Sequence, residues 1–147
     1  MNDDAKQRAL RILERRDVSR KMLLDKLAEK GIEPYDAEEV ADWLCGLGVV
    51  DDRRFAGLVV RSCARKGYGE RRIREELYQK GIPRELWDSA LEELPPADDT
   101  VYQLLQRKMA AGAELPKIRS FLLRRGFSWE EISAAEERYR SENEEQI

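Results

Sequence analysis

The sequence predicts an all-α protein of three tandem three-helix repeats, which form an elongated, curved right-handed or solenoid-like array. One observation is that apolar residues recur at helical spacing along the 147 residues. Another is that one pattern occurs three times without a gap, aligned on Gly31, Gly81 and Gly126. Self-similarity at such a period is typical of tandem helical units that bury apolar faces against their neighbours.

The repeated pattern has apolar residues four and eight positions before each glycine. These residues are Leu27, Leu77 and Leu122, and Leu23, Ile73 and Ile118. A lysine or arginine directly precedes each glycine. Glycine often ends a helix in the left-handed conformation, and a cation suits the negative end of the helix dipole. We therefore expect the middle helix of each repeat to end at its glycine.

Capping residues predict where several helices begin. Ser19 precedes the second helix, and its hydroxyl can accept a hydrogen bond from a free N–H group there. Asp36 with Glu39, and Ser128 with Glu131, have the spacing of a capping box at the third and ninth helices.

Prolines complete the division of the chain. Pro83 suits the first turn of the sixth helix, and the Pro95–Pro96 pair separates the second repeat from the third. The expected helices span residues 5–16, 19–30, 36–47, 52–66, 69–80, 83–93, 98–111, 114–125 and 128–143. The expected repeats are 1–47, 48–94 and 97–143, followed by an acidic tail at 144–147.

Composition argues against several functional classes. The chain has no histidine, and its two cysteines, Cys45 and Cys63, are too few for a disulfide framework or a zinc site. No nucleophile–base pair, metal cluster or cofactor loop is evident, so we expect a protein that is not an enzyme, with no catalytic, cofactor or metal site. No apolar run is long enough for a membrane span. Reduced thiols indicate a cytoplasmic protein.

Charge alternates along the chain in blocks. Residues 53–84 carry ten basic and three acidic side chains, whereas residues 31–52 carry no basic and seven acidic ones. The first two helices of each repeat are basic and the third is acidic. Two interpretations remain open: solubility with salt bridges between helices, or recognition of a partner with a charged groove.

The middle helix of the second repeat has the clearest candidate contact surface. On a helical wheel Arg71, Arg74 and Tyr78 lie on its outer side, and Arg72 lies on a flank. Arginines beside an exposed tyrosine suit phosphate contacts and protein interfaces. The other candidate contact residues are Arg61, Arg65, Lys66, Arg119, Arg124 and Arg125. Because basic helices recur in every repeat, no single helix stands out as a DNA-recognition helix.

Several motifs together resemble the RecX family of regulatory proteins. The matching residues are Ala9–Leu10, Leu13, Arg16, Ser19, Leu23, Leu27, Lys30–Gly31, Gly48–Ala56, Gly67–Gly69, Arg72–Ile73, Glu76–Leu77 and Lys80–Ile82. The resemblance is strong over residues 8–94 and weaker over 98–140. Asp51 or Asp52 can cap the fourth helix, and Phe55 is expected to anchor the second repeat, so this motif is read as structural. The family usually has leucine at Val50, and its members are usually less acidic.

The resemblance implies a modulator of the RecA recombinase in DNA repair, recombination and the SOS response. Such proteins lodge in the groove of the RecA–DNA filament and inhibit its ATPase, strand-exchange and coprotease activities. The expected partner is therefore the RecA nucleoprotein filament, with weak contact to bare DNA, and the expected state is a monomer. The alternatives are a DNA-binding module that acts without RecA and a helical scaffold for another protein.

Overall fold

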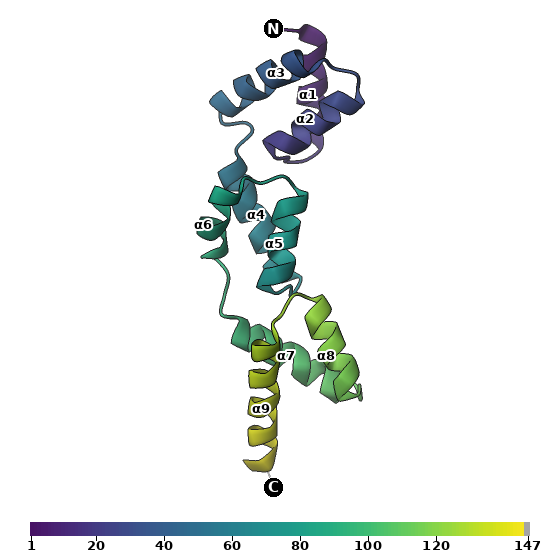
Figure 1. Ribbon diagram of the computed structural model, residues 1–147, viewed down its shortest axis with the longest axis vertical. Coiled ribbons are helices and arrows are strands. Elements are labelled where there is room, and N and C mark those ends of the chain that lie inside the picture. Colours follow the sequence, from purple (N-terminus) through teal and green to yellow (C-terminus); the bar gives the residue numbers. More distant parts are fainter. Residues whose placement is uncertain (146–147) are drawn as a thin grey trace. The chain divides into compact units, whose positions relative to one another are not determined.

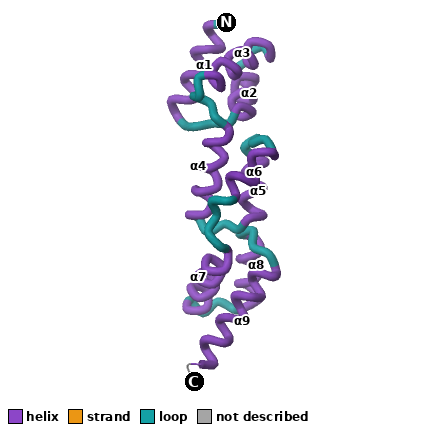
Figure 2. Tube along the Cα trace, turned by 90° about the vertical axis from the view of Figure 1, so that its left-hand side faces the viewer, coloured by secondary structure: helices purple, strands orange, loops and turns teal. Residues whose placement is uncertain are grey.

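The computed structural model describes residues 1–145, and within this part helices and loops are the only structure present (Figure 1, Figure 2). The helices are α1 (Asp3–Arg15), α2 (Arg20–Glu29), α3 (Pro34–Gly46), α4 (Asp52–Arg65), α5 (Glu70–Gln79), the 3-10 turn η1 (Arg84–Leu86), α6 (Trp87–Leu91), α7 (Ala97–Ala110), α8 (Leu115–Arg124) and α9 (Trp129–Glu145). Among residues 1–145 there is no helix both long and apolar enough to cross a membrane.

The chain folds into two compact units. Unit 1 consists of residues 1–59 and 76–90, and unit 2 consists of residues 60–75 and 91 onward. The division between them passes through α4 and α5, so each unit contains part of both helices. The repeat boundaries at 1–47, 48–94 and 97–143 stay a prediction.

The core of unit 1 is formed largely by α1, α2 and α3, which pack on one another (Figure 1). Its buried side chains are Ala5, Ala9, Val18, Leu23, Leu27, Ala37, Val40, Ala41, Leu44 and Val50. Leu23 and Leu27, which the repeated pattern places on the inner face of α2, have no exposed surface.

The core of unit 2 lies between α7, α8 and α9. Its buried side chains are Val101, Tyr102, Leu105, Ile118, Leu122, Phe127, Ile132 and Ala135. Ile73 and Leu77 of α5 are also fully buried. All six apolar positions before the glycines are therefore buried, as the alignment of the three patterns predicts.

Two of the predicted helix caps are confirmed. Ser19 Oγ accepts a hydrogen bond from the backbone N–H of Met22 at 3.1 Å. Ser128 and Glu131 form the predicted capping box, with Glu131 N donating to Ser128 Oγ at 3.1 Å and Ser128 N donating to Glu131 Oε1 at 2.8 Å.

The predicted cap of α3 by Asp36 is wrong. The helix begins two residues earlier, at Pro34, and its N-cap residue Glu33 makes no side-chain capping bond. The fixed φ angle of proline suits the first helical position, so Pro34 starts the helix without a polar cap. Asp36 lies inside the first turn.

The expected helix at 83–93 is also shorter than predicted. Residues 84–86 form a 3-10 turn, and α6 ends at Leu91. Pro95 disfavours the helical conformation for Leu94 and has no N–H group to donate, so the chain leaves the helix before it. At the other end, α9 continues to Glu145, so the expected tail begins inside this helix, and its residues 146–147 lie outside the described part.

Candidate partner-binding site

Nine of the ten predicted contact residues belong to unit 2, and Tyr78 belongs to unit 1. Most of the nine residues of unit 2 lie where three helix ends meet. These are the C-terminal ends of α4 and α8 and the N-terminal end of α5. Gly69 N donates to the carbonyl oxygen of Arg125 at 2.7 Å, and Arg71 N donates to that of Gly126 at 3.3 Å. The guanidinium of Arg71 donates to the carbonyl oxygen of Leu123. We call residues 65–72 and 123–127 the helix-end junction.

The junction brings opposite helix ends together. The last carbonyl groups of α8 carry partial negative charge, and the first N–H groups of α5 carry partial positive charge. These groups have no partners inside their own helices. The hydrogen bonds from Gly69 N and Arg71 N pair two of the groups at these ends and attach the chain after α8 to the start of α5.

Two of the predicted arginines lie over the ring of Tyr68 within the junction. The Cζ atom of Arg72 lies 4.5 Å from the centroid of the Tyr68 ring, and that of Arg125 lies 5.4 Å from the same centroid. Arg125 also donates to the carbonyl oxygen of Lys66 at 2.7 Å and lies 4.9 Å from the centroid of the Phe121 ring. Arg72 and Arg125 are half-buried, and these contacts give both side chains a role in folding.

Four other predicted cations pair with carboxylates of the same unit. The N–O distances are 2.6 Å for Arg61–Glu93, 3.9 Å for Arg71–Glu75, 3.6 Å for Arg74–Glu70 and 2.7 Å for Arg119–Glu136. The hydrogen bonds between Arg119 and Glu136 raise the pKa of Arg119. Arg71 and Arg74, on the outer side of α5, therefore also make contacts within the protein. Salt bridges between helices account for part of the charge pattern.

Three cations and one aromatic of the predicted set remain available to a partner. The side chains of Arg65, Lys66 and Arg124 are exposed and form no ion pair with any side chain described among residues 1–144. Tyr78 on α5 is 70% exposed. These four side chains can contact another molecule without first breaking an internal interaction.

The motif around Asp51 connects two helices of unit 1. Asp51 Oδ1 accepts from the backbone N–H of Arg54 at 3.1 Å, so Asp51 caps α4. Asp52 Oδ1 accepts instead from the N–H of Arg20 at 2.8 Å, at the first residue of α2. Phe55 is buried. The two aspartates therefore serve two different helices.

The three repeated glycines all have positive φ angles, of 82° at Gly31, 71° at Gly81 and 99° at Gly126. A Cβ atom on Gly81 would lie 2.6 Å from Lys21 Cβ. The Ser19 hydroxyl donates to the carbonyl oxygen of Lys80, next to this glycine. In unit 1 the end of α5 thus docks on the start of α2, in the way that α8 docks on α5 in unit 2.

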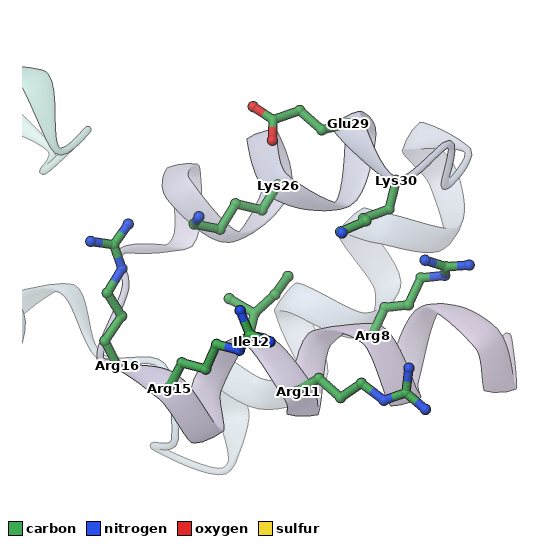
Figure 3. Close-up of a pocket in the computed structure, with 8 residues that line it drawn as sticks. All are labelled: Arg8, Arg11, Ile12, Arg15, Arg16, Lys26, Glu29 and Lys30. Carbon is green, nitrogen blue, oxygen red and sulfur yellow. The ribbon is translucent and has the colours of Figure 1, made fainter.

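A second group of cations was not in the predicted set. Six basic side chains of α1, α2 and the residues that directly follow these helices surround one cleft in unit 1 (Figure 3). They are Arg8, Arg11, Arg15, Arg16, Lys26 and Lys30. The spacing of Arg8, Arg11 and Arg15 by three and four residues was a usable signal, because it puts them on one helix face. Acidic residues in the same block reduce the net charge of residues 1–30 to +3, so the block's net charge did not indicate this group of cations.

Comparison with known proteins gives consistent similarities. The family model described as RecX, first three-helix domain, matches residues 5–44, and the one described as RecX, second three-helix domain, matches residues 51–91. The chain is 41% identical over 145 residues to Regulatory protein RecX of Escherichia coli O1:K1 / APEC, covering 85% of each chain. It is 40% identical over 135 residues to Regulatory protein RecX of Xanthomonas oryzae pv. oryzae (strain MAFF 311018), covering 88% of this chain and 84% of the relative.

Solved structures show the same fold. The crystal structure of RecX from Lactobacillus salivarius matches with a TM-score of 0.81 and 23% identity, over 92% of this chain and 94% of that one. A crystal structure of regulatory protein RecX matches with a TM-score of 0.80 and 22% identity, over 92% and 72%. The predicted all-α fold of tandem helical repeats is therefore confirmed.

Proposed function

Because this chain belongs to the RecX family of regulatory proteins, we propose that it is a non-enzymatic regulator that binds in the groove of the RecA–DNA filament. Binding there inhibits the ATPase, strand-exchange and coprotease activities of RecA. The protein acts as a cytoplasmic monomer in DNA repair, recombination and the SOS response.

The observation that carries this proposal is the group of exposed, unpaired cations at the helix-end junction. Arg65, Lys66 and Arg124 come from two helix ends that the junction holds together. A filament groove presents DNA phosphates and acidic side chains, so a rigid positive surface is attracted to it. In unit 1, Tyr78 is an exposed aromatic side chain of the kind that protein interfaces favour.

The paired cations of the predicted set have a supporting role in this proposal. Arg72 and Arg125 hold the junction together through Tyr68 and the end of α4. Arg61, Arg74 and Arg119 are engaged with carboxylates and are less available to a partner. A test that reverses only the unpaired charges therefore separates binding from folding.

The test is inhibition of RecA ATPase on single-stranded DNA by a junction variant, R65E/K66E/R124E. We expect the concentration for half-inhibition to rise by about tenfold or more, because each lost attraction becomes a repulsion. The melting temperature should stay near that of the original protein, since changes to exposed, unpaired side chains alter stability by only about 0.5 kcal/mol each.

The matched control is R53E/R107E/K117E. It reverses the same number of exposed cations. None of them belongs to the predicted set or forms an ion pair with a described side chain, in residues 1–144. We expect this variant to inhibit within about threefold of the original protein. Equal inhibition by the junction variant and the control would place the contact surface elsewhere. Failure of the original protein to affect RecA at all would overturn the proposed function.

A further inference from the structure

The cleft between α1 and α2 has a strongly one-sided lining. Its volume is about 360 Å³, and it lies wholly within unit 1. The lining consists of the six cations named above with Ile12 and Glu29. We call it the α1–α2 cleft.

Most of these cations lack an internal counter-charge. Arg8 pairs with Asp4 at 3.1 Å, but the other five form no ion pair with the side chains described, those of residues 1–144. Glu29 is the one acidic residue of the lining, and Figure 3 shows its carboxylate on the side of α2 away from α1, whereas Lys26 and Lys30 extend toward α1. Like charges gathered without partners repel one another. An external anion would remove this repulsion.

The arrangement fits an extended polyanion better than a compact anion. Arg8, Arg11 and Arg15 follow one face of α1 over about 10 Å, at 1.5 Å of rise per residue. Lys26 and Lys30 stand four residues apart on the opposite wall (Figure 3). Two rows of charge along an open cleft match a polymer with regularly spaced charges, whereas a single small anion would be held by cations that converge on one point.

The chemistry of the lining favours phosphate in that polymer. Four of the six cations are arginines, whose planar guanidinium groups match phosphate oxygens with paired hydrogen bonds. No aromatic side chain lines the cleft, so it offers no surface for base stacking. Ile12 is the one apolar residue of the lining, too little for the apolar face of a partner helix.

We propose that the α1–α2 cleft binds the phosphodiester backbone of a nucleic acid, without regard to base sequence. This inference goes beyond the proposed function, because the contact needs no recombinase. It also assigns a role to the first repeat, which the predicted contact set leaves out.

The test is fluorescence anisotropy of labelled DNA with the purified full-length protein and no RecA. The probes are oligothymidylate of about 20 nucleotides, an abasic strand of the same length and a duplex of the same length. The six cations can neutralise at most six phosphates of a single strand, so log affinity should fall with log salt at a slope no steeper than about −4. The probe with the tighter binding identifies single or double strands as the source of the phosphate.

The cleft variant is R15Q/K26Q/K30Q, and its matched control is R53Q/R107Q/K117Q, which removes the same charge elsewhere. For the cleft variant we expect a slope shallower by about 2 and an affinity loss of about tenfold or more at 50 mM salt. The control and the abasic probe should each stay within about threefold. If the triple variant melts at a lower temperature than the original protein, a double variant at two exposed positions, R16Q/K30Q, replaces it. We expect this double variant to lose DNA affinity too, by a smaller factor.

Three outcomes would overturn the proposal. The first is a cleft variant that binds DNA like the control. The second is an abasic probe bound more than about tenfold more weakly than oligothymidylate, which would mean that bases are read. The third is displacement of DNA by poly-L-glutamate at equal charge, which would identify an acidic polypeptide as the ligand.

Discussion

Gly126 and Gly31 occupy the same position in the repeated pattern, but their surroundings differ. Both have φ angles in the left-handed region. A Cβ atom on Gly126 would lie 2.5 Å from the backbone nitrogen of Arg72, whereas a Cβ atom on Gly31 would meet nothing within 4 Å. The two positions therefore separate conformational strain from close packing.

We predict that Gly126→Ala destabilises the protein clearly more than Gly31→Ala. At Gly31 the loss is the left-handed strain of about 1–2 kcal/mol. At Gly126 the methyl group must also displace the backbone at the start of α5. Thermal or urea unfolding of both variants measures the difference. Equal losses would mean that the start of α5 shifts without resistance.

The environments of individual residues could be predicted from the sequence only in part. The glycine conformation and the buried positions Leu27, Leu77 and Leu122 follow from the local pattern, and both agree with the structure. The contact between Gly126 and Arg72 joins residues far apart in the chain. Periodicity within one helix carries no information about such a contact.

At the scale of helices, Ser19 has two roles at once. Its hydroxyl caps α2 by accepting from Met22 N, and it donates to the carbonyl oxygen of Lys80 at the end of α5. Ser19 has no exposed surface. Ser128 caps α9 in a capping box that involves only its own helix.

We predict that Ser19→Ala is more destabilising than Ser128→Ala. Loss of a cap alone costs about 1 kcal/mol, which is the expectation for Ser128. At Ser19 the carbonyl group of Lys80 also loses its hydroxyl donor, which adds about 1–3 kcal/mol. Urea unfolding of both variants gives the comparison. Similar losses would show that water replaces the hydroxyl at Lys80.

The helices themselves were largely predictable because their signals are local. The capping box at Ser128 and Glu131 was read correctly from residue spacing. The cap assigned to Asp36 was wrong because Pro34 also fits a helix start, and spacing alone did not choose between them. The short α6 shows that a proline pair acts on the residues before it as well as on those after it.

For the whole molecule, net charge hides how the charges are used. The chain has a net charge of −3, yet basic and acidic blocks alternate along it. The most basic block, residues 53–84, contributed most of the predicted contact residues. Arg61 of this block pairs with Glu93 of a later block, and Arg71 and Arg74 pair with Glu75 and Glu70 of the same block. Block sums cannot show these pairings, and they did not single out the cations of the α1–α2 cleft.

The two basic surfaces lead to a prediction about the complete protein on a RecA filament assembled on single-stranded DNA. The junction belongs to unit 2 and the cleft to unit 1. Free-energy effects of independent sites add within about 0.5 kcal/mol. If both surfaces contact the filament, the combined variant, R65E/K66E/R124E with R15Q/K26Q/K30Q, should lose the sum of the two separate losses.

Co-sedimentation with filaments at fixed salt measures the dissociation constant of each variant. We expect the fold-change in dissociation constant of the combined variant to equal the product of the fold-changes of the junction and cleft variants, within about twofold. A factor of about two corresponds to the additivity tolerance of about 0.5 kcal/mol. The two controls, R53E/R107E/K117E and R53Q/R107Q/K117Q, should each bind like the original protein. A combined variant no weaker than the junction variant would mean that the cleft does not touch the filament. The cleft's affinity for free DNA would then belong to a separate activity, because the phosphates inside the filament would be out of its reach.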